Sequence, residues 1–347
     1  MTATPFRFVL SADFYDEAGE LKYDDIGLST FDDHPEISTT TMAEFRQVVM
    51  PDQLQNCHGS LLLTPHVTAD SVRDCDDLLV IARFGVGYDS VDVPACTEQS
   101  VLVTIAVGAV DRPVAEATVG WMIALTHHVL VKDRLVRTGD WDKRSQYMGC
   151  ELRDRTLGMV GLGRIGRSVV KLLEGFGMNQ PIGFDPFLSQ DAFDEIGVRS
   201  VGLQELLQTA DFVSLHCPLS DETRDLIGMT ELSWMKPGAY LINVARGGIV
   251  NEDALYQALK KGQIAGAALD CFDSEPVTEP HRFGEFDNVL LAPHSIAWTN
   301  ELFRDIGRTA CQGVLDLAHG KTPNGIVNPE VLDQPRFQEK WDRLLGR

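Results

Sequence analysis

Short apolar runs alternate along this chain with more polar stretches in which apolar residues recur every three or four positions. Short apolar runs predict buried strands, and the longer spacing predicts amphipathic helices. The predicted strands are 6–10, 61–63, 78–82, 101–106, 157–160, 181–184, 212–216, 240–245, 264–269 and 289–292. The predicted helices begin near residue 42 and continue at 69–76, 91–99, 113–141, 165–173, 203–209, 229–235, 252–261 and 299–319, with 11–42 mainly loop. Strands that alternate with helices predict an α/β fold built on parallel sheets.

The first chemical signal is the turn GLGRIG (161–166), which follows a predicted strand and leads into a predicted helix. In a strand–turn–helix unit that binds a dinucleotide, Gly161 allows the tight turn and Gly163 lets a pyrophosphate approach the backbone. Gly166 lets the helix pack on the strand, and the helix N-terminus offers unpaired N–H groups to the phosphates. A glycine-rich turn alone also arises for purely structural reasons.

Asp185 strengthens the dinucleotide interpretation because of its position after the next predicted strand. It follows the glycines by about 20 residues, where a carboxylate binds the ribose hydroxyls of the adenosine half. A carboxylate there repels a 2′-phosphate, so the sequence favours NAD over NADP. The alternative is a surface aspartate that only ends a strand before Pro186.

Four polar residues stand at the ends of later predicted strands. Arg246 and Asp270 each directly follow such a strand, His294 follows one after Pro293, and Glu275 comes shortly after Asp270. Ligands of open parallel sheets bind at the carboxyl ends of the strands, so these side chains are expected beside the cofactor. Any one of them alone would more often be structural. Together, beside a dinucleotide turn, they predict a catalytic site.

Composition narrows the class of protein. The chain has 347 residues and is 44% hydrophobic, which suits large cores and two domains. The formal net charge of −21 argues against nucleic acid or an anionic membrane as partner, and an anionic substrate would need local cations. Seven scattered cysteines without a CxxC spacing suggest no disulfide framework and no metal site. No signal peptide or membrane-spanning stretch is recognised, so a cytoplasmic protein is expected.

Longer stretches give a more specific match than the glycine turn. They read RFGVGYDSVD (83–92), VGLGRIG (160–166) with FDP (184–186), DFVSLHCPL (211–219), LINVARGGIVNEDAL (241–255), AALDCFDSEP (267–276) and NVLLAPH (288–294). In order and spacing, the chain resembles the D-isomer-specific 2-hydroxyacid dehydrogenases, a family that includes phosphoglycerate and glyoxylate/hydroxypyruvate reductases. The resemblance implies two doubly wound parallel-sheet domains. A flavodoxin-like substrate domain, 1–112 and 298–347, would be interrupted by a Rossmann NAD-binding domain, 113–297.

The resemblance also implies roles for individual residues. Arg246 would bind the substrate carboxylate and carbonyl oxygen, which its planar fork suits. His294 would donate or accept the proton at C2, paired with Glu275. The backbone of Val86 and Gly87 would form a second carboxylate anchor. The implied NAD contacts are Gly161, Gly163, Arg164, Ile165, Gly166, Asp185, Cys217, Val244 and Asp270.

The expected activity is NAD-dependent interconversion of a D-2-hydroxy acid and its 2-oxo acid by hydride transfer. Related formate dehydrogenases carry Gln where Glu275 stands, so formate is not the expected substrate. An NAD(H)-sensing regulatory protein on the same fold is the alternative, although the acidic composition and the lack of a low-complexity extension count against it. Relatives usually dimerise through the helix after the first crossover, and the broad apolar stripe at 114–137 agrees with a homodimer.

Departures from the family pattern concern mainly specificity. Val110 stands where relatives often have Asn, and Pro113 replaces a usual Ser. The run 295–298 replaces a glycine-containing one, and His66 lies in a loop that faces the substrate side chain in relatives. Trp298 and His66 are therefore candidates to line the pocket, while packing between domains is an equally supported interpretation of Trp298. The sequence does not name the substrate.

Overall fold

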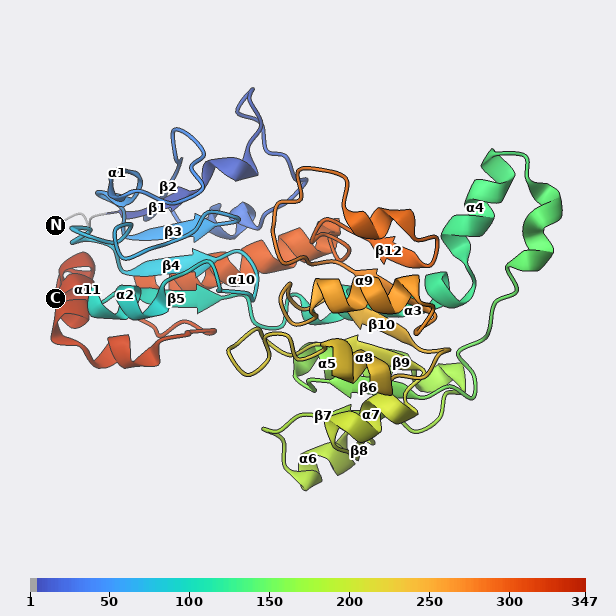
Figure 1. Cartoon of the computed structure of the whole chain (residues 1–347). Helices are drawn as coiled ribbons and strands as arrows, with labels where there is room; N and C mark the ends of the chain where they lie inside the picture. The colour runs from blue at the N-terminus through green and yellow to red at the C-terminus, as the bar shows by residue number, and fades with distance from the viewer. Residues whose placement is uncertain (1–4) are drawn as a thin grey trace. The chain divides into compact units, whose positions relative to one another are not determined.

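The computed structural model describes residues 5–347, and the chain divides into two compact units. Unit 1 comprises Met1–Val110 and Trp298–Arg347, and unit 2 comprises Asp111–Ala297. The chain therefore enters unit 2 between residues 110 and 111 and leaves it between 297 and 298, against expected boundaries at 112/113 and 297/298. Each unit has its own sheet (Figure 1).

Unit 1 contains a five-stranded sheet in the order β2-β1-β3-β4-β5, with every pair of neighbours parallel. This is the order of flavodoxin-like folds, so the predicted architecture of the unit is confirmed. The strands are β1 (Phe6–Leu10), β2 (Ile37–Thr41), β3 (Gly59–Leu62), β4 (Val80–Arg83) and β5 (Leu102–Ile105).

The helices of unit 1 differ from the predicted ones near the N-terminus. They are α1 (Pro51–Leu54), α2 (Val93–Glu98), α10 (Asn300–Ala318) and α11 (Pro335–Leu345), with 3-10 turns η1 (Ala12–Phe14), η2 (Leu28–Phe31) and η6 (Pro329–Asp333). The helix predicted from residue 42 is reduced to the single turn α1, which Pro51 begins. The helix predicted at 69–76 is wrong, because residues 70–74 form turns.

The C-terminal segment of unit 1 is tied to its sheet by buried polar groups. The side chain of Asn328, which is 1% exposed, accepts a hydrogen bond from the N–H of Val103 and donates to the carbonyl of Val101. The ammonium of Lys340 in α11 donates to the carbonyls of Leu78, Gln99 and Ser100. Residues far apart in sequence thus complete one domain.

Unit 2 contains a seven-stranded parallel sheet in the order β12-β11-β10-β9-β6-β7-β8. Counted from β6, this is the Rossmann order extended by one strand, and the winding reverses between β6 and β9. The strands are β6 (Leu157–Val160), β7 (Ile182–Phe184), β8 (Arg199–Ser200), β9 (Phe212–Leu215), β10 (Tyr240–Asn243), β11 (Gly266–Leu269) and β12 (Val289–Leu291).

Helices cover both faces of this sheet because its strands are apolar on both sides. Along β9, Phe212 joins the core under α3 (Asp111–Thr126) and α5 (Arg164–Leu172), whereas Val213 joins the core on the opposite face. The other face packs against α7 (Leu203–Thr209), α8 (Met229–Trp234) and α9 (Glu252–Lys260). Other helical elements of unit 2 are α6 (Gln190–Glu195), η3 (Trp141–Gln146), η4 (Glu174–Phe176) and η5 (Arg282–Glu285).

The long helix predicted after Pro113 is two helices. It breaks after α3 at His128, which adopts a left-handed conformation with φ +53° before α4 (Val129–Arg137) begins. The two axes bend by 60°. Among residues 5–347, no single helix is long and apolar enough to cross a membrane, although α3 and α4 together meet that length and composition.

Candidate active site

The glycine turn joins β6 to α5 at the point where the winding of the sheet reverses. Gly161 has φ +89°, and a Cβ there would lie 2.7 Å from the backbone nitrogen of Cys217, at the end of β9. A Cβ on Gly166 would lie 2.6 Å from the carbonyl oxygen of Gly161, so α5 packs tightly on the turn. Gly163 is the N-cap of α5 and its Cβ position is open. The turn therefore has the backbone features of a phosphate-binding loop.

Asp185 ends β7 and is held against this turn. One carboxylate oxygen accepts a hydrogen bond from the N–H of Leu162 at 2.9 Å, and the other accepts from the N–H of Phe187 at 3.0 Å. Arg164, in the first turn of α5, is paired with Asp111 at 2.7 Å. The expected ribose and pyrophosphate contacts of a dinucleotide thus lie around one turn.

His294 and Glu275 form a hydrogen-bonded pair after the last strands of the same sheet. Glu275 Oε2 lies 2.7 Å from His294 Nδ1, and Glu275 Oε1 accepts from the N–H of Phe272 at 2.9 Å. Because a carboxylate faces Nδ1, this nitrogen carries the proton and Nε2 is the one that can exchange protons with a ligand. His294 remains 46% exposed, so a ligand can reach it.

Charges around this pair favour an ionised glutamate. Burial would raise the pKa of Glu275, but the hydrogen bond and charge of His294, the N–H of Phe272 and the charge of Arg246 together lower its pKa below the ordinary value. Burial raises the pKa of Asp270 to about 6, and the hydrogen bonds that it accepts from the N–H groups of Ile296 and Ser295 oppose that rise. The two carboxyls therefore differ in acidity although both neighbour His294.

Asp270 holds the turn that follows His294. Its Oδ1 accepts from the N–H of Ser295 at 2.8 Å and from the N–H of Ile296 at 3.1 Å. His294 itself has φ +53°, a conformation that needs such support. The side chain of Asp270 is 6% exposed, so much of its hydrogen-bonding capacity serves this turn.

The loop that carries Arg246 is packed backbone to backbone against the loop that carries Glu275. A Cβ on Gly247 would lie 1.8 Å from the carbonyl oxygen of Phe272. Asp273 accepts from the N–H of Gly248 at 2.8 Å, and the side chain of Asn243 donates to the carbonyl of Arg246 at 2.8 Å. Sequence reasoning missed Asn243, Gly247 and Asp273. They lie inside two of the family stretches, but their contacts are with backbone, which no pattern of side chains reveals.

The expected residues of unit 1 lie at the carboxyl end of its own sheet. Val86 and Gly87 follow β4, and His66 is exposed in the loop after β3, where its N–H donates to the carbonyl of Gln47. Trp298 packs edge-on against Tyr23 and Phe303 and is still 48% exposed. The indole is thus anchored by rings of its own unit.

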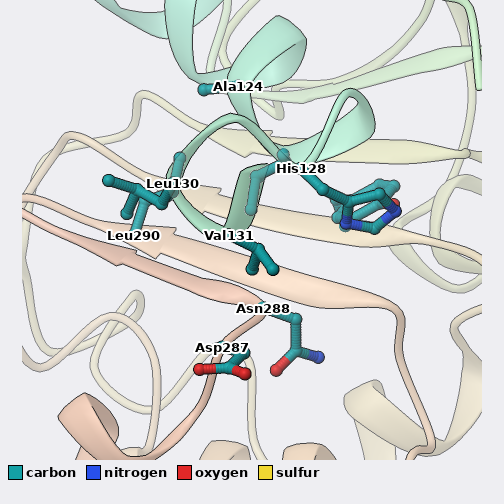
Figure 2. A pocket seen from close by; sticks show the side chains of 9 residues that line it. Ala124, His128, Leu130, Val131, Asp287, Asn288 and Leu290 are labelled. Carbon is teal, nitrogen blue, oxygen red and sulfur yellow. The ribbon is translucent and has the colours of Figure 1, made fainter. Parts of the chain in front are cut away.

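A hollow in unit 2 lies at the opposite, amino end of the strands. It is lined by Ala124, Leu125, His128, Leu130, Val131, Tyr240, Asp287, Asn288 and Leu290. Figure 2 shows Val131 above Asn288, with Leu130 beside Leu290. The lining does not include Arg246, Asp270, Glu275 or His294, so this hollow is separate from the candidate active site.

Comparison with known proteins agrees with this geometry. Residues 119–295 match the model of the D-isomer specific 2-hydroxyacid dehydrogenase, NAD binding domain. The chain is 35% identical over 319 residues to glyoxylate reductase of Korarchaeum cryptofilum, covering 90% of this chain and 96% of that protein. It is 39% identical over 272 residues to D-3-phosphoglycerate dehydrogenase of Methanocaldococcus jannaschii, covering 78% of this chain. The chain spans about half (51%) of the length of that second relative.

Solved structures give the same result for the fold. D-lactate dehydrogenase from Aquifex aeolicus, solved with NAD and lactic acid, superposes with a TM-score of 0.77 at 25% identity. The match covers 90% of this chain and 96% of that one. The expected α/β architecture and the NAD-binding domain are therefore confirmed.

Proposed function

Since the chain belongs to the D-isomer-specific 2-hydroxyacid dehydrogenase family, we propose that it interconverts a small D-2-hydroxy acid and its 2-oxo acid with NAD as cofactor. The observation that carries the proposal is the His294–Glu275 pair, joined at 2.7 Å on the strand-end edge of the NAD-binding unit. Bound NAD would accept or supply the hydride. A histidine paired with an ionised carboxylate is suited to move the accompanying proton.

The residues of unit 2 divide the work on the substrate. In reduction, protonated His294 would give its Nε2 proton to the substrate oxygen, while Glu275 stabilises the imidazolium and fixes the ring. Arg246 would bind the substrate carboxylate and place positive charge where the oxygen becomes negative. Its charge also supplies the local cation that an anionic substrate needs on a chain of net charge −21.

The remaining assignments follow the same logic. Gly161, Gly163, Arg164, Ile165 and Gly166 would bind the pyrophosphate. Asp185 would take the adenosine ribose, Cys217 and Val244 would line the cofactor, and Asp270 would meet the nicotinamide carboxamide. The backbone of Val86 and Gly87 would give the second carboxylate anchor.

An NADH-oxidation screen over glyoxylate, hydroxypyruvate, pyruvate and longer 2-oxo acids tests the activity. Glyoxylate is the first choice, because the chain covers nearly all of a glyoxylate reductase. The substitution Arg246→Lys should lower kcat/KM by roughly 100-fold, because an ammonium cannot contact carboxylate and carbonyl in one plane. NADH affinity should stay almost constant. Tight NADH binding without turnover of any 2-oxo acid would favour the NAD-sensing alternative.

We also propose that the protein is a homodimer through α3, α4 and the segment after them. Apolar side chains are exposed there, with Leu130 at 56%, Val136 at 63%, Trp141 at 60% and Met148 at 80%. Light scattering of Val136→Asp should show a smaller particle than the unaltered protein. Phe187→Asp, at an exposed site after β7, is the control, and equal masses for all three would refute the interface.

A further inference from the structure

Two histidines and a glutamate converge at the edge of the sheet in unit 1, and none of the three is assigned to the proposed reaction. Glu36 Oε1 lies 2.9 Å from His34 Nδ1 and 2.9 Å from His319 Nε2. One ligand atom from each of the three residues lies within 4.8 Å of the others. Glu36 and His319 are 283 positions apart in sequence, so the fold and not local chain geometry brings them together.

Backbone hydrogen bonds fix all three residues in place. The N–H of His34 donates to the carbonyl of Phe31, and the carbonyl of Glu36 accepts from Phe6 at the start of β1. His319 is the C-cap of α10, and its N–H donates to the carbonyl of Leu315. The three side chains are each about one third exposed, at 33%, 38% and 39%. The donor set is therefore preformed and open to solvent on one side.

The spacing suits a transition-metal ion. Two ligands bound at about 2.1 Å to one ion, at angles near 90–109°, lie about 3.0–3.4 Å apart. The two nitrogen–oxygen distances of 2.9 Å lie within about 0.1 Å of the octahedral end of this range. Two imidazoles with one carboxylate are ligands that zinc and its neighbours in the first transition row accept. An oxygen-preferring ion such as Mg²⁺ would not select them.

We propose that His34, Glu36 and His319 form a binding site for a divalent transition-metal ion, such as Zn²⁺. On binding, each imidazole would give up the proton that it now donates to Glu36 and bind the ion through that nitrogen, with the proton of the neutral ring on the other nitrogen. The ion would join the residue before β2, the edge strand of the sheet, to the end of α10. It would act as a structural clip, independent of the reaction proposed for unit 2.

The charge on Glu36 supports this assignment. A carboxylate is ionised at neutral pH, so Glu36 brings one negative charge to the site. His319 also lies at the C-terminus of a long helix, where the helix dipole favours positive charge. Both features stabilise a cation at this place.

Titration of the full-length, chelator-treated protein with Zn²⁺ against a chromophoric competitor tests the site. We expect one equivalent to bind, and His34→Gln and His319→Ala each to weaken it by at least roughly 10-fold. The matched control is His281→Asn, since His281 also pairs with a glutamate, Glu252 at 3.4 Å, but belongs to no group of three candidate ligands among residues 5–347. This control should keep the unaltered affinity.

A second variant protects the test against misfolding. Glu36→Gln keeps the shape and can still accept hydrogen bonds from both imidazoles, but it loses the anionic ligand. Circular dichroism should show its fold unchanged while Zn²⁺ affinity falls. With Cu²⁺ as probe, electron paramagnetic resonance should show two coordinated nitrogens, and one in His34→Gln. A folded Glu36→Gln or His319→Ala that binds Zn²⁺ as tightly as the parent would overturn the proposal, as would absence of binding to the parent.

Discussion

The contact between Gly247 and Phe272 makes Gly247→Ala an informative substitution. The new Cβ would start 1.8 Å from the carbonyl oxygen of Phe272 and 2.2 Å from its carbonyl carbon. Real Cβ contacts are essentially never shorter than 3.0 Å, so the two loops must separate by at least about 1.2 Å. Both neighbours are backbone atoms, so no side-chain rotation can relieve the overlap. The separation would fall between Arg246 and Glu275.

A displacement of this size should damage catalysis without preventing the protein from folding. Misplacing a catalytic group by about 1 Å can cost roughly 100-fold in rate, equivalent to about 2.7 kcal/mol. Overpacking by one methyl group costs about 1–3 kcal/mol of unfolding free energy. We therefore expect Gly247→Ala to fold and to bind NADH, with kcat/KM for the best 2-oxo acid reduced about 100-fold. Stopped-flow NADH oxidation and NADH fluorescence titration measure the two quantities.

Gly238→Ala is the matched control, because it lies just before β10 and a Cβ there meets no atom within 4 Å. It should leave kcat/KM and the melting temperature close to those of the parent. If Gly247→Ala had the same kcat/KM as Gly238→Ala, the two loops would not need their close contact. The contact of Gly247 with Phe272 would then have no part in placing Arg246 and Glu275.

Three further substitutions test other parts of the molecule. Asp185→Ser should reduce the preference for NADH over NADPH, expected at roughly 100-fold in the parent, because the repulsion and hydrogen bonds of a carboxylate are lost; equal use of both cofactors by the parent would contradict this. Glu275→Gln removes the charge that stabilises protonated His294, so pH–rate profiles should show reduction losing activity at lower pH than in the parent and oxidation relatively favoured; unchanged profiles would separate Glu275 from the proton transfer. Burial lowers the pKa of Lys340 to about 8 in the folded protein, below the ordinary value of 10.5 that holds in the unfolded chain. Between pH 8 and pH 10.5 the unfolded chain therefore binds more protons than the folded protein, and the unfolding free energy should rise with pH. Relative to Lys340→Met, denaturant titrations should show a rise of about 3 kcal/mol between pH 8 and 10.5, and a constant difference would refute it.

The fold was predictable wherever a strand is buried on both faces. The run containing β10 is apolar at each position up to Asn243, so its pattern identifies it without tertiary information. Strand β2 escaped prediction because only Ile37 is buried and the four residues after it are exposed. An edge strand rich in Thr and Ser has β propensity but no apolar run, and only pairing with β1 reveals it.

The helices show the limits of periodicity in the same way. The apolar spacing continues smoothly through His127 and His128, so the sequence predicts one long helix. Histidine can adopt the left-handed conformation seen at His128, but a histidine in the sequence does not predict it. At 69–76 the apolar spacing predicted a helix, but the segment forms turns that bury Val72 and Cys75 without one.

The candidate site divides along similar lines. Arg246, Asp270 and His294 were predicted as site residues because polar side chains just after apolar strands must lie at one edge of a parallel sheet. The contacts that hold the Arg246 loop could not be predicted from the sequence, because they join a side chain to a backbone group. Asp273 accepts from the N–H of Gly248, and Asn243 donates to the carbonyl of Arg246. A sequence pattern predicts where in the fold a side chain lies, but not which backbone group it hydrogen-bonds to.

The discontinuous construction of unit 1 sets an order of events during synthesis. Residues 111–297 leave the ribosome as a complete unit, whereas residues 5–110 must wait for 298–347. Until then Val103 lacks its partner Asn328, and the ring of Phe84 lacks Phe303 of α10. A ribosome stalled once residue 297 has left the exit tunnel would therefore carry a folded, protease-resistant unit 2, with the sheet of unit 1 still open to cleavage and to chaperones.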